Sequence, residues 1–216
     1  MSNSVIPVRR RQGRLFVVSA PSGTGKTSLC QEIVSVLPNI WYSVSYTTRP
    51  RRATEVAAQH YHFIDTQTFR AMIEQDEFLE WAEVYGHLYG TPRGPLREWH
   101  EQGIDVLLDI DTQGAAQIRK REPSAVSIYV LPPSLGVLRR RLENRQSDSP
   151  EEIARRFKKA KEEVRHYKDY QYVVINDDFK SAFRELEAIV LAERNRTDLL
   201  DLSALERALT GEEEER

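Results

Sequence analysis

The residues best suited to chemistry lie in one short stretch near the N-terminus. Small and glycine residues lead into a lysine and two hydroxyl residues: Ala20, Pro21, Ser22, Gly23, Thr24, Gly25, Lys26, Thr27 and Ser28. Glycines let backbone N–H groups turn inward around an anion, and a helix that starts here adds the positive end of its dipole. Lys26 could reach the outer phosphates of a nucleoside triphosphate, and Thr27 could offer its hydroxyl to magnesium. The stretch predicts a phosphate-binding loop, with Ala20 where the usual pattern has glycine.

The segments on either side of this loop fit the prediction. An apolar run over residues 15–18 precedes it, and apolar residues recur at helical spacing between 29 and 37. Strand, loop and helix in this order are the context in which such a motif binds phosphate. The alternative is a glycine-rich turn that binds nothing, and the two flanks argue against it.

A second signal lies at the end of another apolar run. Residues 104–109 predict a buried strand that ends in Asp109, and Asp111 follows two residues later. Ligands of parallel sheets bind at the carboxyl ends of the strands, so we expect Asp109 near Lys26 and Thr27, where it could hold magnesium directly or through water. Asp111 would face the same side if the strand geometry continues. It could also cap a helix over 112–121, and the two roles are compatible.

The elements that must position these residues alternate along the chain. Strand-like runs near 14–19, 104–110, 125–131 and 171–175 alternate with helix-like runs near 26–37, 112–121, 134–145 and 179–195. This pattern predicts an α/β fold with a central, mainly parallel sheet flanked by helices.

Two regions break the alternation. Residues 40–90 contain short strand-like pieces (42–46, 61–64, 78–85) and a short helix near 66–76, which predicts a small mixed α/β lobe inserted in the fold. Residues 139–165 are basic and contain few large apolar residues, which predicts an exposed, mobile helical flap. An ordinary solvated helix pair is the alternative for this second region.

The overall composition narrows the function classes. The chain has 216 residues, a net charge of −2 and one cysteine, Cys30. This charge gives no global reason to expect nucleic acid or a membrane as a partner, and no apolar run approaches the roughly 20 residues of a membrane span. A single cysteine excludes an internal disulfide, and no signal peptide is evident, so we expect a cytoplasmic protein.

The two ends of the chain differ from its middle. Residues 1–13 hold Arg9, Arg10 and Arg11 without periodicity, and we expect a flexible arm there. Residues 197–216 combine spaced leucines with an acidic end, which predicts a short helix and a solvated tail. That helix could cap the core or pair with a second subunit in a homo-oligomer, and capping is the favoured interpretation.

Several segments taken together resemble one enzyme family. Besides the phosphate loop, they are residues 43–52 (SVSYTTRPRR), 61–63 (YHF), 77–82 (EFLEWA) and 108–114 (LDIDTQG). This combination closely resembles guanylate kinase, which phosphorylates GMP from ATP, over about residues 14–195. The resemblance implies a P-loop nucleotide kinase with a GMP-binding lobe (about 42–96) and a helical lid (about 139–165), inside a domain of residues 14–196.

The resemblance also implies substrates and site residues. The substrates are ATP, bound with Mg²⁺, and GMP, with dGMP as a further acceptor. The implied catalytic residues are Lys26, Arg49, Arg141, Arg145 and Arg156. The GMP phosphate is held by Arg49, Arg52, Tyr61 and Tyr89, and the guanine is read by Ser45, Glu80, Thr91 and Asp111. Residues 20–28 and Asn176 bind ATP, while Thr27 and Asp109 hold the metal.

The residue types suit these roles. Guanidinium groups bind phosphate oxygens in pairs, and phenol hydroxyls donate to the remaining ones. Ionised carboxylates only accept hydrogen bonds, so Glu80 and Asp111 would pair with the N–H groups of guanine and would repel the N1 acceptor of adenine. Ser45 could donate to guanine O6.

Each of these assignments has a structural alternative. Arg49 and Arg52 could form a solvated basic turn, and Tyr61 and Tyr89 could pack against each other inside the lobe. Glu80 could be a surface residue on an edge strand.

Three other functions are alternatives to this one. A guanylate-kinase-like scaffold module would bind a phosphorylated peptide without turnover, but residues for ATP are present here. A kinase for another monophosphate conflicts with the two guanine-reading carboxylates. A nucleic-acid-dependent NTPase is disfavoured by the near-neutral charge and the lack of a basic face.

Overall fold

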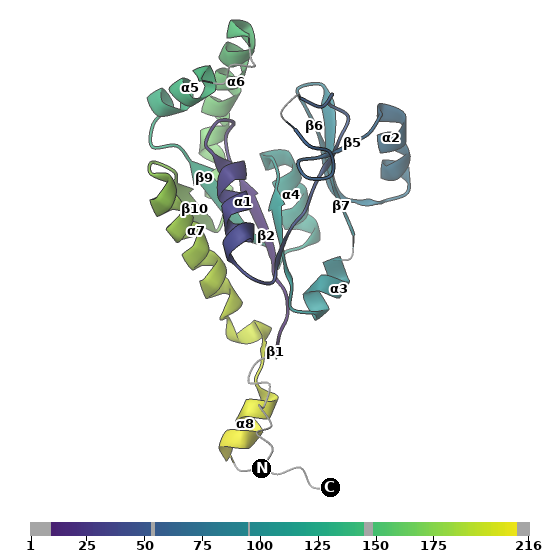
Figure 1. The fold of residues 1–216 in the computed structure, drawn as a ribbon, viewed down its shortest axis with the longest axis vertical. Coiled ribbons are helices and arrows are strands. Elements are labelled where there is room, and N and C mark those ends of the chain that lie inside the picture. The colour runs from purple at the N-terminus through teal and green to yellow at the C-terminus, as the bar shows by residue number, and fades with distance from the viewer. Residues whose placement is uncertain (1–9, 53–54, 95, 145–148, 211–216) are drawn as a thin grey trace.

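A five-stranded parallel sheet forms the centre of the molecule in the computed structural model, which describes residues 10–52, 55–94, 96–144 and 149–210 (Figure 1). Its strand order is β10-β9-β2-β8-β3, and all neighbouring strands run parallel. The strands are β2 (Leu15–Ser19), β3 (Ile40–Tyr42), β8 (Asp105–Asp109), β9 (Val126–Leu131) and β10 (Tyr172–Ile175). The predicted α/β class is confirmed, and the carboxyl ends of β2 and β8 lie side by side.

Helices cover both faces of this sheet because its central strands bury side chains on both sides. On one face, Phe16 and Val18 of β2 join a core with α1 (Lys26–Val36) and α7 (Phe179–Arg194). On the other face, Val17 joins a core with α4 (Thr112–Arg121) and α3 (Leu96–Glu101). Cys30 is fully buried in the first core.

A second, four-stranded sheet forms the inserted lobe. Its order is β5-β4-β7-β6, with β4 parallel to β5 and antiparallel to β7. The elements are β4 (Tyr46–Thr47), β5 (His62–Phe63), β6 (Phe78–Val84), β7 (His87–Pro92) and α2 (Thr66–Glu74). The expected mixed α/β architecture is therefore present, and β6 and β7 form its antiparallel hairpin.

The start of the lobe differs from the expectation. The sequence predicted one strand over 42–46, but Ile40–Tyr42 belongs to the edge of the central sheet and Tyr46–Thr47 to the lobe. The chain crosses from one sheet to the other at residues 43–45, and the apolar pattern does not mark that crossing. The strand β7 and the helix α3 were also not predicted as separate elements.

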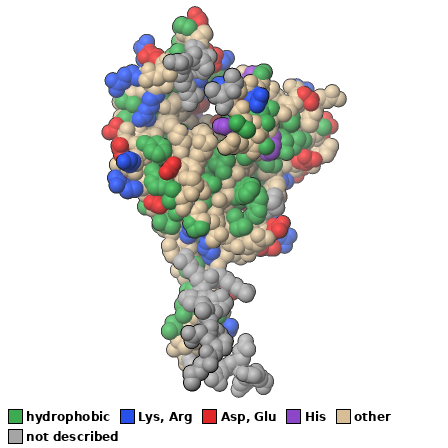
Figure 2. Space-filling view, viewed as in Figure 1, with side chains coloured by type: hydrophobic (Ala, Val, Ile, Leu, Met, Phe, Trp, Pro, Cys, Tyr) green, Lys and Arg blue, Asp and Glu red, His purple; other side chains and the backbone are tan. Residues whose placement is uncertain are grey.

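The described part of the basic region 139–165 is mainly helical. Helices α5 (Leu135–Glu143) and α6 (Pro150–Glu163) form a pair with its own small core of Leu138, Leu142 and Ala160. The short helix η1 (Val164–Asp169) leads back to β10. Lys and Arg side chains gather on the left of the view over α5, α6 and α7 (Figure 2). Among the described helices, none has the length and apolarity that crossing a bilayer requires.

The prediction of a flexible arm is wrong for residues 10–13. The strand β1 (Arg10–Arg11) pairs antiparallel with β11 (Leu200–Asp201), and the Gln12 N–H donates to the Leu199 carbonyl at 3.0 Å. These partners lie almost two hundred residues away in the sequence, so composition alone did not reveal them. Residues 1–9 lie outside the described ranges.

The C-terminal helix does not cap the core. After η2 (Thr197–Leu199) and β11, helix α8 (Ser203–Thr210) extends away from the body of the molecule (Figure 1). Leu209 on this helix is 77% exposed, so the favoured interpretation of capping is wrong. The acidic tail lies outside the described residues.

Candidate active site

The phosphate-binding loop occupies the turn between β2 and α1. Gly23 and Gly25 have φ angles of 93° and 90°, in the left-handed region that glycine adopts without a steric penalty. A Cβ on Gly25 would lie 2.6 Å from the side-chain nitrogen of Asn176. That nitrogen donates to the Thr24 carbonyl at 2.6 Å. Asn176 is thus buried against the loop and shapes it, while its direct binding of ATP stays a prediction.

Lys26 and Asp109 meet at the adjacent ends of β2 and β8. The Lys26 ammonium forms an ion pair with Asp109 and donates to the Ile110 carbonyl at 2.8 Å. Burial disfavours the charged lysine, but the Asp109 carboxylate outweighs it and raises the pKa of Lys26. Thr27 is exposed in the first turn of α1. The structure therefore brings Lys26 and Asp109 together, as the strand argument expected.

Tyr42 is a site residue that the sequence reasoning missed. Its hydroxyl donates to Asp109 Oδ2 at 3.1 Å from the neighbouring strand β3. Burial raises the pKa of Tyr42, and the Asp109 charge adds to this shift. Tyr42 is therefore a neutral hydrogen-bond donor at neutral pH. The available sequence signal was its position at the end of a short apolar strand.

The arginines of α5 and α6 contact the phosphate-binding loop. Arg141 donates to the carbonyls of Asn176 (2.9 Å) and Thr24 (3.3 Å). Arg156 is 8% exposed and donates to the Ser22 hydroxyl at 2.5 Å. Arg145 lies outside the described residues. Both described arginines thus converge on the loop from the helix pair.

Arg49 lies among aromatic rings in the lobe. Its guanidinium carbon is 5.6 Å from the centre of the Tyr61 ring, and its Nε donates to the Tyr89 hydroxyl at 3.2 Å. The Tyr61 and Tyr89 rings are 5.8 Å apart and meet edge to face. Arg49 is therefore not part of a solvated turn, whereas the Arg52 side chain is exposed. The two tyrosines do pack together, and this packing leaves Tyr89 directed at Arg49.

Glu55 was also missed, and it contacts both arginines. Its carboxylate accepts from the Arg49 guanidinium at 2.7 Å and from the Arg52 backbone N–H at 2.8 Å. Burial opposes ionisation of Glu55, but these hydrogen bonds outweigh it and lower its pKa. A carboxylate thus stands where the sequence predicted phosphate oxygens. Its position three residues after Arg52 was the available signal.

Glu80 is a buried carboxylate in β6. It is 4% exposed and accepts a 2.5 Å hydrogen bond from the Thr91 hydroxyl on β7. Burial raises the pKa of Glu80 to about 7, and the nearby Asp111 charge acts in the same direction. The alternative of a surface residue is therefore wrong for Glu80, although β6 is an edge strand.

The start of α4 closes this part of the site. Asp111 caps the helix by accepting from the Gly114 N–H at 2.9 Å, as the helix-cap alternative predicted. A Cβ on Gly114 would clash with the Glu80 carboxylate, so glycine permits the close approach of helix and strand. Ser45 is half-buried in the segment between β3 and β4, and its carbonyl accepts from the His62 N–H at 2.9 Å.

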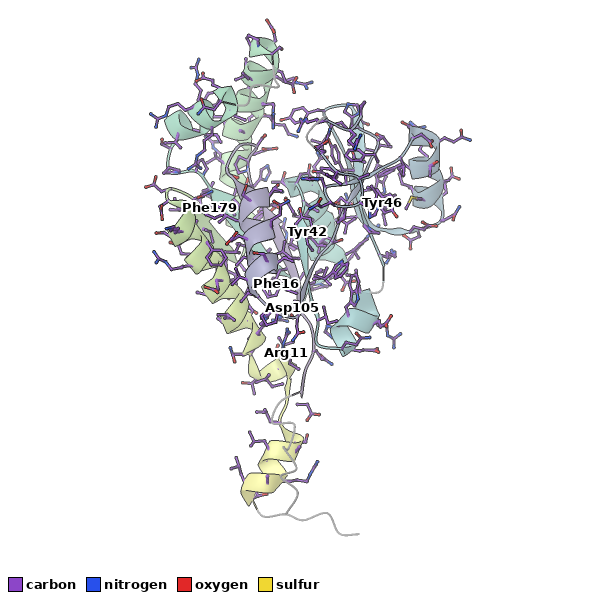
Figure 3. The ribbon with its side chains drawn as sticks, viewed as in Figure 1. Arg11, Phe16, Tyr42, Tyr46, Asp105 and Phe179 are labelled. Carbon is purple, nitrogen blue, oxygen red and sulfur yellow. The ribbon has the colours of Figure 1, made fainter. Side chains whose placement is uncertain are left out.

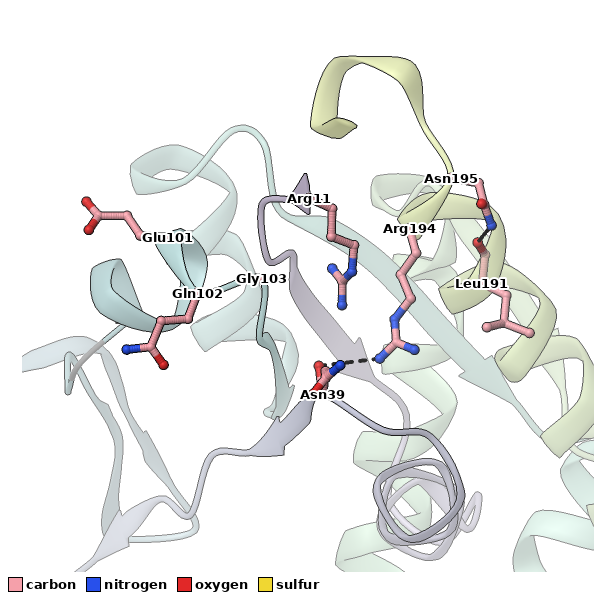
Figure 4. A pocket seen from close by; sticks show the side chains of 8 residues that line it. All are labelled: Arg11, Asn39, Glu101, Gln102, Gly103, Leu191, Arg194 and Asn195. Carbon is pink, nitrogen blue, oxygen red and sulfur yellow. Dashed lines mark hydrogen bonds between the residues drawn. The ribbon is translucent and has the colours of Figure 1, made fainter. Parts of the chain in front are cut away.

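A large cavity lies elsewhere in the molecule. It has a volume of about 680 Å³ and lies near the amino end of β8, away from the phosphate-binding loop (Figure 4). Arg11 and Arg194 line it, but both guanidinium groups bind the buried Asp105. The cavity contains none of the predicted site residues, so we do not assign the substrates to it.

The structure has the features that define a P-loop nucleotide kinase. These are a parallel sheet with a glycine loop, lysine and helix at its carboxyl edge, an inserted mixed lobe, and a basic helix pair. The guanylate kinase family model matches residues 12–193. The chain belongs to the guanylate kinase family and is a kinase.

Individual relatives agree with this assignment. The guanylate kinase of Geobacter metallireducens is 50% identical over 188 residues, which cover 87% of this chain and 93% of that protein. The guanylate kinase of Geobacter sulfurreducens is 47% identical over the same shares. The crystal structure of guanylate kinase from Anaplasma phagocytophilum is 32% identical, has a TM-score of 0.80, and covers 95% of this chain and 100% of its own.

Proposed function

We propose that the enzyme transfers the γ-phosphoryl group of ATP to GMP, giving ADP and GDP in purine nucleotide metabolism, and that it also accepts dGMP. The observation that carries the proposal is the match of residues 12–193 to one family, because this range includes both the phosphate-binding loop and the lobe with Glu80. We name residues 42–96 the acceptor lobe and residues 139–165 the lid.

The donor half is the phosphate-binding loop with the lid. Residues 20–28 would hold the phosphates of ATP, with Asn176 supporting the loop. Lys26 and the lid arginines Arg141, Arg145 and Arg156 would neutralise the charge that spreads over the transferring group. Support comes from the contacts of Arg141 with Thr24 and of Arg156 with Ser22.

Thr27 and Asp109 would hold Mg²⁺ together with the ATP phosphates. Hydroxyl and carboxylate oxygens are ligands that magnesium accepts, and it commonly uses one or two carboxylates plus substrate phosphates. Among the described residues, no group of three or more His, Cys, Asp or Glu side chains is placed to hold a metal ion. When bound, the ion offsets the negative charge of the phosphates. Lys26 and Tyr42 orient the Asp109 carboxylate.

The acceptor half is the lobe together with the start of α4. Arg49, Arg52, Tyr61 and Tyr89 would hold the GMP phosphate, and the phosphate would compete with Glu55 for the Arg49 guanidinium. Ser45, Glu80, Thr91 and Asp111 would read the guanine. The ionised Glu80 would accept from guanine N–H groups, and the Thr91 hydroxyl fixes the direction of that carboxylate.

The chemistry needs little acid–base catalysis. A phosphate monoester has a second pKa of about 6, so GMP offers an anionic oxygen near neutral pH. Positioning of this oxygen in line with the γ-phosphorus, with charge stabilisation by arginines and Lys26, can supply most of the rate enhancement.

A coupled assay with ATP and magnesium against GMP, dGMP, AMP, CMP and UMP tests the proposal. We expect GMP to give the highest kcat/KM, followed by dGMP. Faster turnover of AMP would overturn the role of Glu80 and Asp111. Binding of GMP without turnover would point instead to the scaffold module.

Two further parts of the proposal concern the protein as a whole. We place the enzyme in the cytoplasm, which cell fractionation tests. Self-association stays a prediction, and light scattering at assay concentrations tests it. The exposed Leu209 on α8 is a residue to substitute in that experiment.

A further inference from the structure

The turn that joins β6 and β7 carries an unusual tyrosine. Tyr85 and Gly86 have φ angles of 54° and 80°, the left-handed pair of a tight two-residue hairpin. Asn, Asp or Gly normally occupies the first of these positions, because a large side chain is disfavoured there. Such strain persists only where surrounding contacts hold it in place. Contacts of the Tyr85 ring are therefore expected to hold this turn in place.

The Tyr85 ring contacts two cations of the lid helix α6. The guanidinium carbon of Arg155 lies 4.7 Å from the ring centre, and the Lys159 ammonium lies 4.6 Å from it. Both distances fall inside the range of about 6 Å for cation–π attraction. Arg155 and Lys159 are four residues apart, so one face of the helix presents both.

Ion pairs within α6 hold these two cations in place. Glu152 accepts from Arg155 at 2.8 Å and 2.9 Å, and Glu163 lies 3.5 Å from Lys159. The cations are thus oriented by acidic residues of their own helix as well as by the ring. The Tyr85 side chain, in contrast, comes from the acceptor lobe and is half-buried at this contact.

The same helix also contacts the donor loop. Arg156, next to Arg155, is buried and donates to the Ser22 hydroxyl. Helix α6 therefore touches the acceptor lobe through Arg155 and the phosphate-binding loop through Arg156. A change in the contact with Tyr85 would move the helix that carries Arg156.

We propose that Tyr85 is a positioning residue that docks the acceptor lobe onto lid helix α6, so that closure of lobe and lid is coupled to the placement of Arg156 at the donor loop. This inference rests on the proposed division of the enzyme into donor loop, lid and acceptor lobe. Tyr85 touches neither substrate in this scheme and acts through α6.

Two substitutions distinguish the effect of losing the Tyr85 ring from the effect of the backbone strain. Tyr85→Asn removes the ring and places a residue that tolerates the left-handed conformation, so thermal stability should be kept or raised. Tyr85→Phe keeps the aromatic face and is the matched control. We expect kcat/KM for GMP to fall about five- to tenfold in Tyr85→Asn, and to stay within about twofold in Tyr85→Phe.

A distance measurement tests the docking directly. Glu74 on α2 and Lys158 on α6 are exposed, and Cys30 is buried, so Glu74→Cys and Lys158→Cys allow specific labelling for energy transfer. With ADP and GMP bound, we expect the parent and Tyr85→Phe to share one short separation and Tyr85→Asn to shift to a longer one. An unchanged separation and an unchanged kcat/KM in Tyr85→Asn would overturn the proposal.

A combined variant decides whether the two cations are the partners. In the background Arg155→Met with Lys159→Met, Tyr85→Asn should cause no further loss. An equally large loss in that background would mean that Tyr85 acts without these cations, which contradicts the proposal. Failure of the parent protein to phosphorylate GMP would refute the proposed function instead, and the distance measurement would still decide the docking.

Discussion

Strand β8 carries an aspartate at each end, and the two side chains have different surroundings. Asp105 at the amino end is fully buried and accepts from Arg11 at 2.6 Å and 3.0 Å, and from Arg194 at 2.6 Å. The backbone N–H of Arg14 adds a fourth hydrogen bond at 2.7 Å. Asp109 at the carboxyl end meets one cation, Lys26, and one hydroxyl donor.

The difference separates a structural carboxylate, Asp105, from Asp109, for which we propose a functional role. The charged partners of Asp105 come from β1 and from the end of α7, so this side chain ties both ends of the domain to the central sheet. Figure 3 shows Arg11 and Asp105 close together. The partners of Asp109 belong to the donor loop and to β3, beside the place where we put ATP. Residue type and strand are the same, so the partners and the end of the strand determine the role.

The largest effect expected is that of Lys26→Ala. We expect kcat to fall by about 10³-fold or more, since the variant loses a cation that acts on the transferring phosphoryl group. The shift in melting temperature should be smaller than that of Asp105→Ala, because Asp109 keeps the hydrogen bond from Tyr42, whereas loss of Asp105 leaves two guanidinium groups without their carboxylate. The coupled assay and thermal unfolding measure both quantities.

The control for this variant is Lys120→Ala, which removes an exposed lysine of α4. It should leave kcat and stability unchanged. Near-normal turnover of Lys26→Ala would contradict the functional role of this end of β8.

Asp105→Ala should have the largest effect on stability. Removing one partner from a buried ion-pair network costs about 3–5 kcal/mol, because the remaining guanidinium charges lose their counterion. For a chain of this size that corresponds to a fall in melting temperature of roughly 6–20 °C. Activity per folded molecule should stay within about twofold, as measured by assay and calorimetry.

Glu101→Ala is the matched control for Asp105→Ala. Glu101 forms an ion pair with Arg97 in which both side chains are mostly exposed (63% and 93%), and exposed pairs contribute little to stability. If Asp105→Ala lost activity without losing stability, the contrast between the two ends of β8 would be wrong.

Glu80→Gln tests the acceptor side. We expect kcat/KM for GMP to fall by about 10²-fold, because the amide presents a donor to the guanine N–H groups, while the KM for ATP changes by less than about twofold. Equal losses for both substrates would mean that Glu80 has a structural role. Steady-state kinetics with each substrate varied separates these outcomes.

The raised pKa of Glu80 also predicts a pH dependence. With a pKa of about 7, Glu80 is largely protonated at pH 6 and ionised at pH 8, so GMP affinity should rise across this interval. The GMP phosphate also titrates near pH 6, and Glu80→Gln keeps that titration while losing the one at pH 7. Calorimetric GMP titrations at several pH values should show a weaker rise in Glu80→Gln. An identical profile in both proteins would exclude Glu80 as its source.

The raised pKa of Glu80 makes folding stability change with pH in the opposite direction to GMP affinity. Because the folded state raises the pKa of Glu80 from 4.5 to about 7, the folded protein binds this proton more tightly than the unfolded chain between these values. The contribution of Glu80 to stability is therefore present at low pH and is lost as the pH rises toward 7. Glu80→Gln should flatten this slope in denaturant unfolding.

Local patterns predicted most of the central sheet and the donor loop. Strand and helix periodicity located β2, α1 and β8, and the order of elements indicated that Asp109 would lie near Lys26. Partners that are distant in sequence could not be predicted this way. Asp105 and Arg11 are 94 positions apart, and Asp105 and Arg194 are 89 apart.

The same limit explains the missed residues of the site. Tyr42 becomes important only because β3 pairs with β8, and Tyr85 only because α6 lies against the β6–β7 turn. Neither neighbour can be read from a single sequence. For Glu80 the sequence was sufficient to identify the residue, because it lies in the EFLEWA motif of residues 77–82. Its burial and raised pKa could not be predicted, because they depend on the close approach of the helix start at Gly114.

The smallest effect expected is that of Tyr42→Phe, and it compares the two ends of β8 most directly. The substitution removes one hydrogen bond to Asp109 and keeps the ring, so Lys26 still holds the carboxylate. We expect a loss of about three- to fivefold in kcat/KM, a higher magnesium requirement and almost no change in melting temperature, since one net hydrogen bond contributes about 1 kcal/mol.

At the other end of the strand, Arg11→Met also removes hydrogen bonds to an aspartate, yet it should lower the melting temperature and leave kcat/KM unchanged. Assays over a range of magnesium concentrations, with thermal unfolding of both variants, test this pair. A contrary result would be that Tyr42→Phe destabilises the protein as Arg11→Met does and leaves the magnesium dependence unchanged. Asp109 would then be a structural residue like Asp105, and the metal-binding role proposed for it would be wrong.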